Sequence, residues 1–145
     1  MARLADSKLI KIPVIRDSRG NLSSIEGNKN IPFDIQRVFY LYDIPGGAIR
    51  EGHAHRQLHQ VVFALAGSFD VVIDDGYGRQ VIHLNRSFNG LYIPNLLWRE
   101  LNNFSSGSVC MVLASEHYEA LDYIRSYDEY LSLVNPQKNM VPNHP

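Results

Sequence analysis

Short apolar runs that end at turn signals recur along most of the chain. β-Branched and aromatic residues dominate these runs, which is typical of β-strands. We predict strands at 38–42, 61–65, 69–73, 80–84, 90–93 and 108–114, with the strand pair around Asp75-Gly76 joined as a hairpin. Strands at this spacing favour an all-β sandwich or barrel.

The pattern changes to a helical period after Ser115. Apolar and aromatic positions then recur at Leu121, Ile124, Tyr127 or Asp128, and Leu131. We therefore predict a C-terminal α-helix that opens at Ser115 and packs on the barrel. No repeat or linker divides the chain, so residues 1–134 are expected to form one domain. Residues 135–145, which contain three prolines, are expected to form a mobile tail.

Composition narrows the class of protein. The 145 residues, 45% hydrophobic and 20% charged, suit a soluble domain with its own core. A net charge of −1 gives no basic field for nucleic acid or membranes, and no apolar stretch approaches the ~20 residues of a spanning helix. The N-terminus lacks a secretory pattern, and the single cysteine, Cys110, sits in an apolar run. We expect a cytoplasmic protein in which Cys110 is a buried hydrophobe.

The most informative segment runs from Gly47 to Gly67. His53 and His55 are two residues apart, so on a strand they face the same side. Five residues separate Gly47 from His53, four separate His55 from Gln60, and six lead to Gly67. This spacing resembles the first cupin motif, which has glutamate where this chain has Gln60. The resemblance implies a cupin-like antiparallel β-barrel or jelly roll, with a C-terminal α-helix here.

A second segment matches the other cupin motif, P-x-G-x-x-H-x-x-x-N, with two departures. It runs from Pro94 to Asn103, with Leu96 at the glycine and Arg99 at the ligand histidine. Arginine has no lone pair to donate, and the neutral amide of Gln60 is a poor substitute for a carboxylate. We therefore expect no metal, which disfavours a metal-dependent dioxygenase or isomerase.

Further stretches resemble the sugar-nucleotide 3,4-ketoisomerases, which act on dTDP-4-keto-6-deoxyglucose. They lie at 17–22, 31–38, 90–94, 98–100, 112–115, 122–125 and 127–128, and the resemblance extends from about residue 8 to 131. It implies an isomerase that moves a keto group from C4 to C3 through an enediolate. The expected context is dTDP-deoxyaminosugar biosynthesis for lipopolysaccharide or another glycan. The family also dimerises with exchange of the N-terminal strand, so we expect a homodimer.

The reaction needs an acid and a base that titrate near neutrality, and histidine supplies both. The resemblance implies that His53 takes the proton from C3 and that His55 shuttles protons among the oxygens or returns one to carbon. The two roles are open to exchange. Arg99 is a candidate for stabilising the enediolate, with Gln60 and Tyr40 as polar companions. The reaction requires no cofactor, and the sequence contains no phosphate-loop motif.

The substrate is expected to be a small molecule that carries a diphosphate, for which arginine is well suited. Arg50 and Arg37 are the candidate diphosphate ligands, and Glu100 and Tyr127 are candidates for contacts with the sugar or nucleotide. The sequence leaves the C4 configuration of the product, gluco or galacto, undetermined, with Arg16 and Arg99 as the suspected determinants.

Two other functions stay open. A cupin-type 3,5-epimerase would use similar base chemistry and keep the ketone at C4. A non-catalytic sugar-binding cupin would hold the ligand unchanged.

Overall fold

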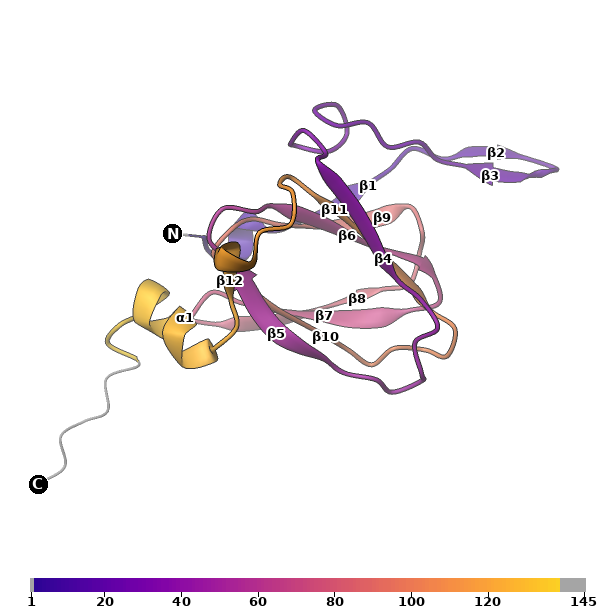
Figure 1. The fold of residues 1–145 in the computed structure, drawn as a ribbon. Helices are drawn as coiled ribbons and strands as arrows, with labels where there is room; N and C mark the ends of the chain where they lie inside the picture. The colour runs from indigo at the N-terminus through magenta and orange to yellow at the C-terminus, as the bar shows by residue number, and fades with distance from the viewer. Residues whose placement is uncertain (1, 139–145) are drawn as a thin grey trace, which may run out of the picture.

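Two five-stranded antiparallel sheets face each other and form a flattened barrel (Figure 1). The computed structural model describes residues 2–138, apart from the side chain at position 51. The first sheet has the order β1-β9-β6-β11-β4, with β1 at Lys8–Lys11, β9 at Asn89–Ile93, β6 at Gln60–Ala66, β11 at Val109–Ala114 and β4 at Arg37–Leu41. The second has the order β12-β5-β10-β7-β8, with β12 at Tyr123–Ile124, β5 at Arg50–His55, β10 at Trp98–Asn102, β7 at Phe69–Asp74 and β8 at Arg79–Leu84.

This architecture confirms the predicted all-β, cupin-like barrel with a C-terminal helix. All the predicted strands are present, although their ends differ by a residue or more. Five strands were not predicted: β1, β10, β12 and both arms of the hairpin formed by β2 (Ile15–Asp17) and β3 (Gly20–Leu22) are short or have too few apolar residues for a clear pattern. Strand β5 was expected only as the strand that carries His53 and His55. The hairpin projects away from the barrel (Figure 1).

The predicted start of the C-terminal helix is wrong. Helix α1 covers Tyr127–Val134, and its N-cap is Ser126, whose hydroxyl accepts the backbone N–H of Glu129. Between Ser115 and this helix lie a 3₁₀ turn at Ala120–Asp122 and the short strand β12. The helical spacing was misleading because Ile124 pairs with Ala54 in the sheet, while Leu121 is 84% exposed.

The N-terminal part also contains a 3₁₀ turn at Leu4–Asp6. After α1, residues 136–138 form a turn, and the rest of the predicted tail lies outside the described residues. No helix within residues 2–138 is both long and apolar enough to cross a membrane.

Hydrophobic packing fills one end of the space between the sheets and leaves the other end open. The main core cluster includes Val62, Phe69, Val71, Leu91 and Phe104, contributed by both sheets. Strand β6 is buried on its other face too, because Val61 and Phe63 pack against Ile12 and Ile31 of the N-terminal segment. Burial on both faces explains why β6 is a continuous apolar run in the sequence.

The second sheet is covered on its outer side by α1. Trp98 of β10 and Ala54 of β5 pack against Tyr130 and Val134 of the helix. The Tyr130 hydroxyl, which is fully buried, donates to the carbonyl oxygens of Asp74 and Leu96. The helix therefore fixes the two strands that carry the histidine pair and Arg99.

Candidate active site

A cavity of about 450 Å³ opens between the sheets at the end that the core does not fill. Its wall includes His53, Gln60, Arg99, Arg50 and Glu100, all of them predicted from the sequence. The remaining wall residues are Phe39, Leu41, Ile49, Val62, Leu101, Val112, Tyr123 and Arg125. The cavity thus combines an apolar floor with a small set of polar and cationic groups, as small-molecule sites usually do.

Strand register brings His53 and Arg99 together. The two residues are Cα partners across β5 and β10, so their side chains project from adjacent positions on the same face. Arg99 and Leu101 alternate inward along β10, whereas Trp98 packs outward against the helix. Residues about 45 positions apart in the sequence therefore meet at one point in the cavity wall.

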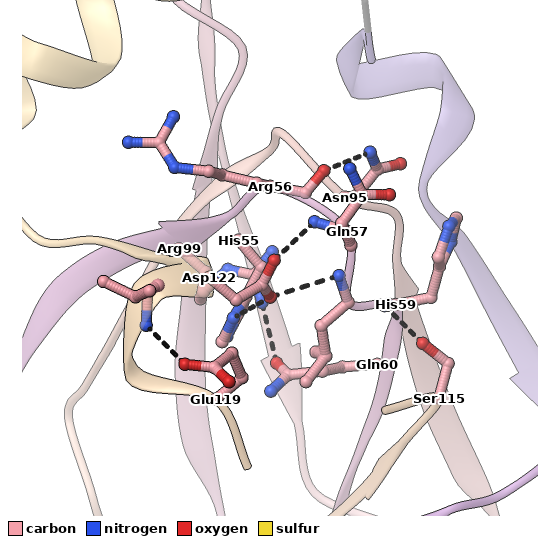
Figure 2. Close-up of polar contacts among 12 residues, drawn as sticks. His55, Arg56, Gln57, His59, Gln60, Asn95, Arg99, Ser115, Glu119 and Asp122 are labelled. Atoms are coloured by element: carbon pink, nitrogen blue, oxygen red, sulfur yellow. Dashed lines mark hydrogen bonds and ion pairs between the residues drawn. The ribbon is translucent and has the colours of Figure 1, made fainter. Parts of the chain in front are cut away.

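Arg99 is fully buried and is held by uncharged oxygens. Its Nη1 donates to Gln60 Oε1 over 2.7 Å, and its Nη2 donates to the Leu97 carbonyl over 2.7 Å, as Figure 2 shows in part. Nε reaches the same carbonyl over 3.1 Å. Burial lowers the Arg99 pKa to about 10, which leaves the group cationic at neutral pH. The site therefore holds a fixed positive charge beside His53.

The residues at the cupin ligand positions do not suit a metal ion. Gln60 Oε1 already accepts from the Arg99 guanidinium, which stands where the fourth ligand would be. Within residues 2–138 no three His, Cys, Asp or Glu side chains lie together in a way that could hold a metal ion. A cation at this point would meet a guanidinium instead of a lone pair.

His55 lies behind the cavity wall with no exposed surface. Its ring packs edge-on against His53, with centroids 4.8 Å apart, and against Tyr123 at 4.4 Å. Nδ1 lies 3.1 Å from Asp122 Oδ2, the pair drawn near the centre of Figure 2. Burial lowers the His55 pKa far below its ordinary value, and the charge of Arg99 acts in the same direction. The imidazole is therefore neutral at physiological pH.

Two further arginines lie in the cavity wall, and another, Arg37, lies on β4 two residues before the wall residue Phe39. Arg50 and Arg125 contribute to the wall. The Arg37 guanidinium stacks over Phe39 at 5.0 Å and Tyr118 at 5.5 Å. Its Nε and Nη2 are buried and have no hydrogen-bond partner among the described residues. Donors in that state are suited to an anionic ligand that arrives from outside.

Four predicted site residues do not contribute to the cavity wall: His55, Arg37, Tyr40 and Tyr127. Tyr40 points to the opposite face of β4, where it is 60% exposed and packs beside Tyr42. The Tyr127 hydroxyl donates to Asp74 Oδ2 over 2.7 Å. Glu100 contributes to the wall, but its Oε2 accepts from Trp98 Nε1 on the outer side of β10.

Sequence reasoning missed Asp122, Tyr123 and Arg125 as site residues. They form part of a stretch that carries the family resemblance, yet the helical spacing assigned them to a helix. In the structure Tyr123 pairs with His55 along β5, which brings this stretch to the cavity. Phe39 was missed because strand parity alone did not reveal which face of β4 points inward.

Comparison with known proteins supports the resemblance. Residues 5–135 match the family model FdtA, described as WxcM-like, C-terminal. The chain is 46% identical over 136 residues to the TDP-4-oxo-6-deoxy-alpha-D-glucose-3,4-oxoisomerase of Aneurinibacillus thermoaerophilus, with 92% of this chain and 98% of that protein covered.

Two solved structures are also similar. The WlaRB TDP-quinovose 3,4-ketoisomerase from Campylobacter jejuni has 44% identity and a TM-score of 0.85, with 88% of this chain and 98% of that chain covered. The sugar 3,4-ketoisomerase QdtA from Thermoanaerobacterium thermosaccharolyticum, in complex with TDP, has 41% identity and a TM-score of 0.89, with 93% and 98% covered.

Proposed function

The chain belongs to the FdtA (WxcM-like, C-terminal) family, and from this membership and the cavity we propose that it is a 3,4-ketoisomerase of TDP-4-keto-6-deoxyglucose. The structural observation that carries the proposal is the pairing of His53 with the buried cation of Arg99 in a cavity of about 450 Å³. A base next to a fixed positive charge is what removal of a proton beside a carbonyl requires.

The reaction begins with loss of the C3 proton to His53. The C–H electron pair becomes the C3–C4 double bond, and the C4 carbonyl oxygen becomes an oxyanion. Arg99 stabilises that negative charge through a preorganised cation that has little contact with water. Because the hydrogens leave and return as protons, the sequence of steps requires no redox cofactor.

The second half of the reaction returns a proton to carbon at C4. The C3 hydroxyl loses its proton, its oxygen becomes the new ketone, and the double-bond electrons take a proton at C4. His55 is the group that we assign to the oxygen protons, because its ring lies directly against His53. Proton transfers of this kind contribute about 10²–10⁴-fold each.

Arg37, Arg50 and Arg125 supply the positive charge for the diphosphate of the substrate. The two unpartnered donors of Arg37 favour this role most directly. Loss of charge-assisted hydrogen bonds worth about 1.5–3 kcal/mol would weaken TDP binding by about 10–100-fold in Arg37→Leu. Titration calorimetry with TDP measures this, with Arg86→Leu, an exposed arginine of the β8–β9 loop, as the control. Equal affinities in the two variants would contradict the assignment.

We also propose a cytoplasmic homodimer. The hairpin β2–β3 exposes Ile15 and Leu22, which are 65% and 58% accessible and would be buried by a second copy. The single unpaired Cys110 suits a reducing compartment. Light scattering of the purified protein measures the mass, and a monomer would refute the dimer.

The reaction is tested by proton NMR of the protein with TDP-4-keto-6-deoxyglucose in D₂O. A 3-keto product that carries deuterium at C4 is the expected result, and its coupling constants assign the gluco or galacto configuration. A ketone retained at C4 with inverted neighbouring carbons would indicate an epimerase, and an unchanged substrate would indicate a binding protein. His53→Asn should abolish turnover, whereas His83→Asn should not, since His83 pairs with Asp70 on the outer face of β8.

A further inference from the structure

Asp122 lies outside the cavity wall and yet contacts the buried histidine. Its Oδ2 is 3.1 Å from His55 Nδ1, whose side chain has no exposed surface. The carboxylate comes from the 3₁₀ turn before β12, a segment that joins β5 through the Tyr123–His55 pair. The same pairing that places Tyr123 in the wall therefore places Asp122 behind it.

Backbone groups fix the orientation of the carboxylate. Asp122 Oδ1 accepts the N–H of Gln57 over 2.7 Å (Figure 2), and Oδ2 accepts the N–H of Leu58 over 3.3 Å. The Asp122 carbonyl accepts the Arg56 N–H over 2.9 Å. Four hydrogen bonds thus connect Asp122 with the segment 55–58, and its side chain is not free to turn away.

These contacts define which nitrogen of His55 carries hydrogen. A carboxylate only accepts hydrogen bonds, so Nδ1 must be the donor. In a neutral imidazole the other nitrogen is then a bare acceptor. Nε2 is buried and has no partner among residues 2–138, while the ring itself lies against His53 and Tyr123 of the wall. An unpaired buried acceptor is rare in a folded protein and calls for a functional explanation.

We propose that Asp122 is the positioning residue for His55: it holds the Nδ1–H tautomer and so leaves Nε2 free to accept a proton during the isomerisation. The inference rests on the proposed function. Nε2 takes the proton of the C3 hydroxyl, whose oxygen keeps the O–H electron pair and becomes the C3 carbonyl. The imidazolium, stabilised by Asp122, then gives the proton to the C4 oxyanion. One proton leaves O3, one arrives at O4, and His55 returns to its neutral form.

The substitution Asp122→Asn tests the tautomer directly. An amide offers one oxygen and one NH₂, so one of the two positions must become a donor. Keeping the oxygen on the short 2.7 Å bond to Gln57 gives up only the longer 3.3 Å bond from Leu58 and places the NH₂ against His55 Nδ1. Nδ1 then becomes the acceptor and the hydrogen moves to Nε2, which removes the acceptor on which the proposal depends.

The primary measurement is the ¹⁵N–¹H correlation spectrum of histidine-labelled protein, with the His55 signals identified by their loss in His55→Gln. We expect the Nδ1–H tautomer in the wild type and the Nε2–H tautomer in Asp122→Asn. For the same variant kcat should fall by ~10²-fold or more with KM little changed, because the wrong tautomer affects proton transfer and not binding. The wild-type measurement does not depend on Asp122→Asn, so a misfolded Asp122→Asn would leave that test intact.

Asp70→Asn is the matched control. Asp70 Oδ1 pairs with His83 Nδ1 at 2.6 Å on the outer face of the second sheet, and neither residue belongs to the cavity wall. This variant should alter the His83 signals and leave the His55 tautomer and kcat unchanged. An Nε2–H tautomer in the wild type would overturn the proposal, as would a fall in kcat for Asp122→Asn without a tautomer change. Failure of the wild type to convert the substrate would refute the proposed function, and the tautomer of His55 would still decide whether Asp122 sets its protonation.

Discussion

Replacement of Arg99 by methionine separates the contribution of this residue to the reaction from its contribution to stability. Methionine is unbranched and apolar, so it fills much of the space of the arginine stem without the charge. The variant removes the cation beside His53 and the donors to Gln60 and Leu97. We expect a large loss of activity and a small change in stability.

The magnitudes follow from the environment of the guanidinium. Lowering of the Arg99 pKa from 12.5 to about 10 by burial corresponds to ~3 kcal/mol of disfavoured charge at ~1.4 kcal/mol per pKa unit. Removing the charge recovers that ~3 kcal/mol, but the oxygens of Gln60 and Leu97 each lose a hydrogen-bond donor, which costs about 1–3 kcal/mol per oxygen. The two effects oppose each other, so the change in the free energy of unfolding should lie between a gain of about 1 kcal/mol and a loss of about 3 kcal/mol.

For the reaction, loss of one preorganised donor to a developing oxyanion lowers kcat by about 10²–10³-fold. Steady-state NMR of TDP-4-keto-6-deoxyglucose conversion measures kcat, and urea unfolding followed by circular dichroism measures stability. Arg86→Met serves as the control for loss of an exposed arginine. A kcat for Arg99→Met within a factor of a few of the wild-type value would refute the role of Arg99 in the reaction. Unfolding so ready that it accounts for the lost activity would refute the expected small change in stability.

Three further outcomes follow from burial in the same structure. Gly52→Ala would place a Cβ 2.5 Å from Trp98 Cζ2, so it should lower the free energy of unfolding by about 1–3 kcal/mol. It should also shift the fluorescence of Trp98, the only tryptophan of the chain. An unchanged melting temperature and an unchanged emission spectrum would contradict this prediction. Burial raises the pKa of Cys110 to about 12, so its thiol should resist a disulfide reagent until urea unfolds the chain. Rapid labelling of the native protein would contradict the burial of Cys110. His55 is neutral when folded and has an ordinary pKa of 6.5, so the unfolded state binds the extra proton and stability should fall by up to ~1.4 kcal/mol per pH unit below pH 6.5. His55→Gln should lose that part of the slope in urea titrations between pH 7 and pH 5.

The strand pattern was predictable from sequence where burial is simple. Strand β6 is apolar from Val61 onward and is buried on both faces as far as Ala64, and β7 is buried along most of its length. Strand β10 escaped prediction because its residues serve different ends: Trp98 packs under the helix, Arg99 faces the cavity, and Glu100 binds the Trp98 indole. A strand that serves function on one face does not keep a regular apolar alternation.

The candidate site was predictable where it depends on residues that are close together in the sequence. His53 and His55 are two residues apart on one strand, so their shared face follows from strand geometry alone. That Arg99 lies near His53 was predicted from the motif resemblance. The physical cause is the β5–β10 register, which the periodicity of the sequence does not specify. Tyr40 illustrates the limit, because it was assigned to the site although it projects from the outer face of β4.

By itself the sequence determined the all-β class, the histidine pair and the presence of arginine at the position of a cupin metal ligand. Each of these depends on local residue types and spacing, which folding does not alter. Only the tertiary structure decided that Asp122 reaches His55, that Arg37 has buried donors without partners, and that the helix begins at Tyr127. The Asp122 contact and the late start of the helix arise because β12 joins β5 at the edge of the second sheet. That pairing joins segments more than 60 residues apart, and a contact at such range leaves no periodic trace in the chain.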